Sequence, residues 1–144
     1  MLKTIIAIDI KTRLILNYAT QRGPRSDTKF AISSIRQTRK YNPQLHYYAD
    51  RAYDTEPIRK CINEYVGAFD QIPIKTRAKK GHYRLNSLAI FRPKIYRLRS
   101  NVEGVFSVIK RLFNGTNRSR TLQLANKETK LKNTIIQHLQ INTN

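Results

Sequence analysis

A carboxylate, two cations and a phenol follow one another in a stretch of the chain that reads as a long amphipathic helix. They are Tyr96, Arg99, Glu103 and Lys110, separated by two, three and six residues. At about 100° per residue, they fall within an arc of about 60° on a helical wheel, beside a separate arc of large apolar residues. One carboxylate among cations next to a buried face suits a phosphate substrate and a metal ion.

The same spacing also has a plain structural explanation. Arg99 and Glu103 stand four residues apart, which is the spacing of a routine surface ion pair worth a few tenths of a kcal/mol. Lys110 would then simply be solvated. Asp50, at the carboxyl end of a short predicted strand, and the charge of the whole chain favour the chemical interpretation.

Positive charge dominates the composition. The 144 residues include 28 Lys and Arg against 9 Asp and Glu, a formal net charge of +19. A compact monomer is destabilised by that self-repulsion, whereas a protein lying along phosphates is stabilised by it. Nucleic acid is therefore favoured over an anionic membrane surface or an acidic protein as the partner.

Cysteine and histidine content exclude other classes. Cys61 is the single cysteine, so it forms no internal disulfide, and a reducing cytoplasm fits. Three scattered histidines without a second cysteine exclude a zinc finger. No apolar run approaches the length of a membrane span, and neither a membrane nor a small-molecule substrate is expected as a partner.

Apolar periodicity and turn residues predict one α/β domain with helices covering a mixed sheet. Ser26 or Asp27 can cap the first helix, and Asp54 or Thr55 can cap the second. The last helix should bury Leu131, Ile135 and Leu139. Strands are expected over about 4–10, 14–20, 44–49 and 70–75, and helices over about 27–40, 55–66, 93–113 and 127–141.

A basic segment without apolar periodicity runs from Lys75 to Arg84 around Gly81. It is expected to be a mobile loop. In a chain of this charge, its Lys79 and Lys80 are expected to contact a DNA backbone.

The four-residue helix motif resembles the signature of the prokaryotic insertion-sequence DDE transposases, whose catalytic domain is RNase H-like. Residues 49–54, Ala-Asp-Arg-Ala-Tyr-Asp, resemble the segment with that family's second catalytic aspartate. Residues 6–12, 26–29 and 72–75 resemble its second strand and turn, its first helix start and a later strand. The resemblance implies an RNase H-like mixed sheet flanked by helices, in a DNA transposition enzyme of the prokaryotic cytoplasm and nucleoid.

Roles follow from that resemblance, residue by residue. Asp50 and Glu103 would be catalytic carboxylates that bind Mg²⁺ or Mn²⁺, two ions being expected in a complete site because such a pair stabilises the attacking and leaving oxygens of a phosphodiester. Arg99 and Lys110 would hold the DNA of the transposon ends. Tyr96 would donate to a phosphate or stack on a displaced base.

The resemblance also implies an incomplete site. In the family, the first catalytic aspartate lies on a central strand that precedes the match to residues 4–10, and here the chain begins at Met1 without it. Asp9 is a tempting substitute, but the match places it toward the opposite edge of the sheet. The expectation is a carboxyl-terminal transposase portion, from a truncated or interrupted frame, that binds DNA without catalysing alone. An upstream transposase fragment would complete it, and either that fragment or a second copy of the chain is expected as a protein partner.

Two other functions stay open. One is a noncatalytic basic DNA-binding remnant that interferes with intact transposase by occupying its DNA ends or by forming mixed oligomers. The other is a basic RNA-binding protein, which no RNA-recognition motif supports.

Overall fold

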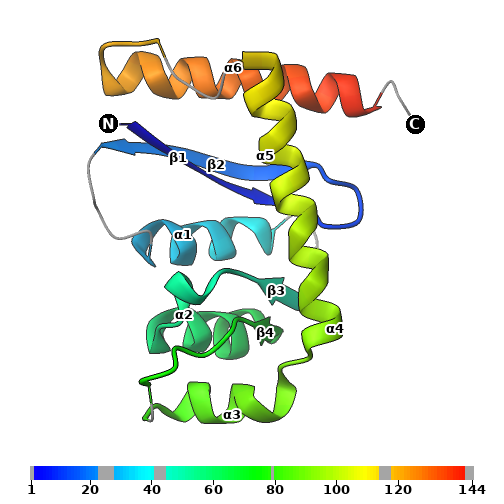
Figure 1. Ribbon diagram of the computed structural model, residues 1–144. Coiled ribbons are helices and arrows are strands. Elements are labelled where there is room, and N and C mark those ends of the chain that lie inside the picture. The colour runs from blue at the N-terminus through cyan, green and yellow to red at the C-terminus, as the bar shows by residue number, and fades with distance from the viewer. Residues whose placement is uncertain (1, 23–27, 41–44, 79, 114–117, 142–144) are drawn as a thin grey trace. The chain divides into compact units, whose positions relative to one another are not determined.

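The computed structural model describes residues 2–22, 28–40, 45–78, 80–113 and 118–141, which form a mixed α/β chain of helices and two small sheets (Figure 1). Contacts divide the chain into two compact units. One combines Met1–Arg25 with Ser100–Asn144, and the other is Ser26–Arg99. Each unit contains one of the two sheets.

The sheet of the first unit is an antiparallel hairpin of β1 (Leu2–Ile8) and β2 (Ile15–Arg22). β1 is rich in β-branched residues, and Ile15, Tyr18 and Thr20 give β2 further β-branched and aromatic side chains, which favour extended backbone. Asp9 closes the hairpin, because its Oδ1 accepts the backbone N–H groups of Lys11 at 2.8 Å and Thr12 at 3.0 Å. The carboxylate of Asp9 therefore stabilises the turn of its own hairpin.

Two helices complete this unit, α5 (Ser100–Phe113) and α6 (Leu122–Ile141). The α6 helix packs on β2, where the hydroxyls of Thr129 and Thr20 lie 3.0 Å apart and the side chain of Gln137 donates to the Ile15 carbonyl at 2.5 Å. Asn101, at the start of α5, donates to the carbonyl of Ile10 at 3.2 Å. These contacts join both helices to the hairpin.

The buried face of α6 differs from the predicted one. Leu131, Ile135 and Leu139 were expected inside, but they are 63%, 38% and 49% exposed. The buried residues of the helix are Ala125, Thr129, Asn133 and Ile136. The prediction was wrong because it followed the large apolar residues. The buried face also uses small and polar side chains, of which Thr129 pairs with Thr20 on β2.

The start of α6 also differs, since the helix begins at Leu122 rather than near residue 127. Thr121 supplies the reason. Its hydroxyl accepts the backbone N–H of Leu124 at 3.3 Å, which is the bond of an N-terminal cap.

The second unit is built on a parallel pair of short strands, β3 (His46–Tyr48) and β4 (Phe69–Gln71). The connection between parallel strands needs a crossover, and here it is α2 (Glu56–Lys60) with the π-helical segment Cys61–Val66. The core joins this crossover to α1 (Thr28–Thr38) and to the residue that follows β4. Its buried residues are Ile35, Ile58, Cys61, Ile62, Ala68 and Ile72.

The strands β3 and β4 are shorter than predicted. β4 ends at Gln71, before Pro73, which has no N–H for a ladder. The 55–66 helix changes to π-helical turns at Cys61 and stops at Gly67, whose φ of 74° is the left-handed conformation that glycine adopts easily. The predicted cap at Ser26 or Asp27 lies outside the described residues.

The helices after β4 also depart from prediction. The segment 75–84 is not loop throughout, because α3 (His82–Ile90) begins within it. The predicted helix over 93–113 contains α4 (Pro93–Tyr96), a 3₁₀ turn at Arg97–Arg99, and then α5.

Candidate functional site

The 3₁₀ turn divides the four residues of the helix motif. Tyr96 and Arg99 belong to the Ser26–Arg99 unit, and Glu103 and Lys110 lie on α5 in the other unit. A 3₁₀ turn advances about 120° per residue, so the wheel for one uninterrupted α-helix does not apply across it. Within α5, Glu103 and Lys110 stand about two turns apart and share one face.

Contacts hold Tyr96 and Arg99 together. The guanidinium carbon of Arg99 lies 5.8 Å from the centroid of the Tyr96 ring, and the Phe91 ring lies 5.4 Å from it. Both Tyr96 and Arg99 are half-buried, whereas Glu103 and Lys110 are exposed. The Tyr96 ring therefore positions a guanidinium fork at the end of this unit.

Asp50 follows β3 and stands just before a 3₁₀ turn, Arg51–Tyr53. Its backbone carbonyl accepts the N–H of Tyr53 at 2.9 Å. The side chain is exposed and makes no hydrogen bond or ion pair to any residue that the structure describes. Its carboxylate oxygens are thus available to a ligand.

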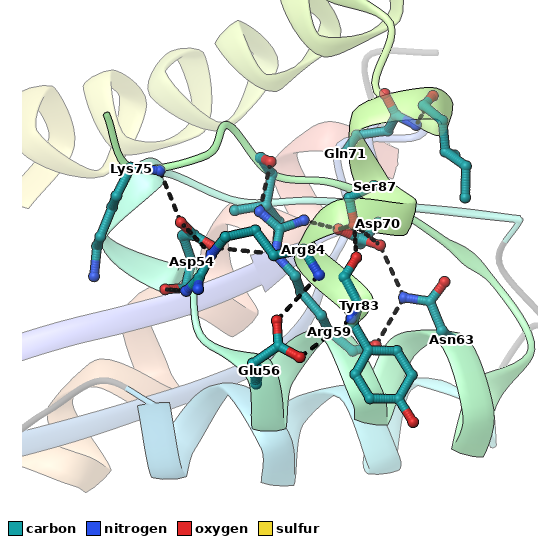
Figure 2. A network of polar contacts seen from close by, with 12 residues as sticks. Asp54, Glu56, Arg59, Asn63, Asp70, Gln71, Lys75, Tyr83, Arg84 and Ser87 are labelled. Atoms are coloured by element: carbon teal, nitrogen blue, oxygen red, sulfur yellow. Dashed lines mark hydrogen bonds and ion pairs between the residues drawn. The ribbon is translucent and has the colours of Figure 1, made fainter. Parts of the chain in front are cut away.

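The most extensive polar cluster of this unit surrounds Arg59, a residue that the sequence did not single out (Figure 2). Arg59 is fully buried on α2. Its Nε donates to Asp54 at 3.0 Å, its Nη2 donates to the carbonyl of Ile72 at 2.9 Å, and its Nη1 pairs with Asp70. A buried guanidinium requires such partners, since an unpaired charge in the interior is very costly.

Asp54 links this cluster to the start of the basic segment. Its Oδ2 accepts the backbone N–H of Lys75 at 2.7 Å, and the Nε of Arg84 donates to its Oδ1 at 2.9 Å. Burial alone raises the pKa of Asp54, but the hydrogen bonds from Lys75, Arg84 and Arg59 outweigh burial and leave that pKa below its ordinary value. Asp54 therefore remains a carboxylate at neutral pH.

The cap predicted at Asp54 or Thr55 is not formed by a side chain. Thr55 occupies the N-cap position of α2 without a side-chain cap hydrogen bond. The carboxylate of Asp54 serves Arg59, Arg84 and Lys75 instead, because two guanidinium groups of this unit have to be neutralised.

Glu56 lies at the start of α2, but its carboxylate caps the start of α3. Its two oxygens accept the backbone N–H groups of Tyr83 at 3.1 Å and Arg84 at 3.0 Å, at the first turn of α3. Gly81 precedes that turn with a φ of 126°. Arg84 also donates to the carbonyl of Lys80 at 2.5 Å. The segment 75–81 is therefore fixed at both of its ends by carboxylates.

This anchoring separates the cations of the segment into two kinds. The guanidinium of Arg84 is paired with Asp54, whereas Lys75, Arg77 and Lys80 have exposed side chains. Lys79 lies outside the described residues. The exposed cations are those that remain for an anionic partner.

Asp70 and Gln71 tie β4 to α3. The carboxylate of Asp70 accepts from Asn63 at 2.8 Å and from the hydroxyl of Ser87 at 2.7 Å. Gln71 donates to the carbonyl of Ile90 and accepts the backbone N–H of Arg92, closing the end of α3. In the sequence, these roles are signalled only by the polar side chains of Asp70 and Gln71, which stand directly before Ile72 in the predicted strand.

A metal site was predicted at Asp50 and Glu103. Within the described ranges, no group of three or more His, Cys, Asp or Glu side chains is placed so that it could hold a metal ion. Over the same ranges, no helix is both long enough and apolar enough to cross a membrane.

These features define a strongly basic α/β protein with an exposed aspartate after a parallel strand and an exposed glutamate on a basic helix. A family model described as a transposase DDE domain matches residues 1–136. The chain belongs to this family, as the spacing of its helix motif predicted. Transposases of this kind act on DNA and generally use divalent metal ions. No curated protein and no solved structure matches the chain.

Proposed function

We propose that this chain takes part in DNA transposition as a portion of an RNase H-like DDE catalytic domain, and that it binds the DNA of transposon ends. Family membership supports the reaction class. The observation that carries the proposal is Asp50, an exposed carboxylate without a partner among the described residues, placed directly after a parallel strand.

Elimination among the acidic residues supports the same assignment. Most described carboxylates serve local structure: Asp9 closes a hairpin, and others neutralise buried arginines, cap helices or pair with lysines. The residues so engaged are Asp9, Asp54, Glu56, Glu64, Asp70 and Glu128. Asp50 has no such local role among the described residues, and the family's chemistry would depend on it together with the exposed Glu103.

The donor chemistry of Asp50 and Glu103 fits Mg²⁺ or Mn²⁺, because exposed carboxylate oxygens are the ligands that these ions prefer. A pair of such ions, when bound, stabilises the attacking and leaving oxygens of a phosphodiester. The chain's own cations position the DNA. Arg99 offers a planar fork to phosphate oxygens and Lys110 a point charge.

Tyr96 donates its hydroxyl to a phosphate while its ring orients Arg99. Lys80, together with Lys79, binds the flanking backbone from the segment that Asp54 and Glu56 anchor. Because phosphate contacts are independent of sequence, these cations supply affinity rather than recognition of a particular repeat.

The carboxylate of Asp9 already forms hydrogen bonds within the hairpin turn, which argues against a catalytic role for Asp9. Its Oδ1 accepts two backbone N–H groups of that turn. We therefore expect the chain alone to bind DNA without cutting it. The third catalytic carboxylate, an aspartate, would then come from another segment or another subunit. The alternative function is a noncatalytic remnant that occupies the DNA ends of an intact transposase or forms mixed oligomers with it.

Affinity for labelled duplex DNA, measured by fluorescence anisotropy with Mg²⁺ and with EDTA, tests the proposal. In EDTA, Asp50→Asn and Glu103→Gln should tighten binding, because each removes a charge that repels phosphate. With Mg²⁺ the same substitutions should weaken binding. If Mg²⁺ does not change the effect of either substitution on DNA affinity, the carboxylates are vestigial and the noncatalytic alternative holds.

Matched substitutions separate the cations. Arg99→Ala and Lys110→Ala should weaken binding more than Arg97→Ala and Arg111→Ala, which remove the same charge from neighbouring exposed positions. Equal losses in all four variants would mean that only net charge matters, and the assigned DNA contacts would be wrong.

A further inference from the structure

A second cationic surface lies where α1 faces the π-helical segment Cys61–Val66. The guanidinium carbons of Arg36 and Arg39 lie 5.3 Å and 5.0 Å from the centroid of the Tyr65 ring. The two elements are held together beneath this surface by Ile35 and Ile62, which are buried in the same core. Tyr65 itself is 45% exposed, so the two guanidinium groups meet on an accessible ring.

Two like charges on one ring repel each other, and the ring quadrupole offsets only part of that repulsion. Within the described residues, neither Arg36 nor Arg39 forms an ion pair. Glu64, the neighbouring acid, is engaged with Lys60 at 3.8 Å and with the hydroxyl of Tyr83. The surface therefore has an excess of positive charge that a bound anion would neutralise.

The geometry favours a phosphodiester backbone over a lipid surface. Guanidinium forks match phosphate oxygens in pairs, and a ring that holds them in place reduces the entropy lost on binding. A membrane-binding helix also needs apolar residues to insert. The exposed side chains of α1 and the residues after it are all polar, namely Lys29, Ser33, Arg36, Gln37, Arg39 and Lys40.

We propose that Arg36 and Arg39, positioned by Tyr65, form a second clamp for the phosphate backbone of duplex DNA, in addition to the contacts of Arg99, Lys110 and the basic segment. The inference rests on the proposed function, namely that the chain binds DNA. Tyr65 acts here as a positioning residue, because its ring faces cations rather than a base.

The test uses the whole chain and a labelled duplex, with affinity measured over a range of salt concentrations. Arg36→Gln combined with Arg39→Gln should weaken binding about tenfold or more and reduce the slope of log affinity against log salt by about 1.8, the release expected for two phosphate contacts. Lys29→Gln combined with Lys94→Gln removes equal charge from exposed positions of the same unit. This control should change the affinity and slope less.

Substitutions at Tyr65 separate positioning from charge. Tyr65→Phe keeps the ring and should bind DNA like the original chain, whereas Tyr65→Leu should weaken binding severalfold without altering the net charge. Circular dichroism of each variant establishes that it is folded. Equal binding by Tyr65→Leu and Tyr65→Phe would overturn the positioning role.

The outcomes distinguish this inference from the proposed function. If the unsubstituted chain fails to bind duplex DNA, the proposed function fails. If it binds, and loses affinity with Arg99→Ala but not with the Arg36 and Arg39 pair, only the clamp is refuted. Loss of binding to vesicles of equal phosphatidylserine and phosphatidylcholine, with unchanged DNA affinity, would assign the surface to lipid instead.

Discussion

Replacing Gly81 by alanine tests how the basic segment is fixed to the fold. Gly81 has a φ of 126°, and a Cβ built there would lie 2.4 Å from Oε1 of Glu56 and 2.7 Å from its Cδ. The end of a glutamate side chain can move away from such a contact. Here that movement would break the bonds by which Glu56 caps the first turn of α3.

The expected cost has two parts. A non-glycine residue at this φ costs about 1 kcal/mol or more of backbone strain. Loss of a helix cap costs about 1 kcal/mol. Gly81→Ala should therefore lower the free energy of unfolding by about 2–3 kcal/mol, measured by urea denaturation followed by circular dichroism.

Two other glycines are matched controls, because a Cβ at either one meets no atom within 4 Å. Gly67→Ala adds only the strain of its φ of 74°, about 1 kcal/mol. Gly104→Ala lies inside α5 and should stabilise that helix by about 0.5–1 kcal/mol. A different order of the three variants would contradict the calculation.

A double substitution isolates the contact. With Glu56→Ala already present, the cap is absent and the clash is relieved, so Gly81→Ala should cost only its backbone strain, about 1 kcal/mol. If Gly81→Ala costs as much in that background as in the original chain, the contact with Glu56 is not the cause, and the reasoning is refuted.

Three further predictions concern charged side chains, each measured by urea denaturation. Arg59→Leu should lower the free energy of unfolding by about 3–5 kcal/mol, because buried Asp54 and Asp70 lose a cation. Because the pKa of Asp54 is lowered in the fold, its contribution should be fully present above its ordinary pKa and should be lost as pH falls from there through the lowered pKa. Glu128→Gln should cost about 1 kcal/mol at pH 7. Lys132 lowers the pKa of Glu128 to about 2, so the difference should vanish as pH falls through about 2.

Local signals in the sequence located much of the candidate site. The hairpin of β1 and β2 follows from two runs of β-branched, aliphatic and aromatic residues around a short connection, and the position of Asp50 follows from the strand before it. These features depend on residues close together in the chain. The spacing of Tyr96, Arg99, Glu103 and Lys110 is also a local signal, and together with the segment around Asp50 it indicates the transposase family.

Long-range pairing explains what the sequence did not reveal. Thr20 and Thr129 form a buried pair although 109 residues separate them, so the inner face of α6 could not be inferred from apolar periodicity. The sequence did not single out Arg59 because its partners come from β4, from the residue after β4 and from the residues before α2. α3 was missed because its cap, Glu56, lies 27 residues before Tyr83.

The contrast between Asp50 and the anchoring carboxylates gives Asp50 its significance. Asp54 and Asp70 neutralise buried cations, so removing either one would weaken the fold. Asp50 has no partner among the described residues, and in a basic chain that binds DNA an exposed carboxylate opposes binding through its repulsion of phosphate. Its position is therefore not explained by stability or by electrostatic attraction to DNA. If Asp50 binds a divalent cation that also binds phosphate, the repulsion becomes an attraction. The effect of Mg²⁺ on the DNA affinity of the Asp50→Asn variant therefore distinguishes a catalytic carboxylate from an ordinary surface residue.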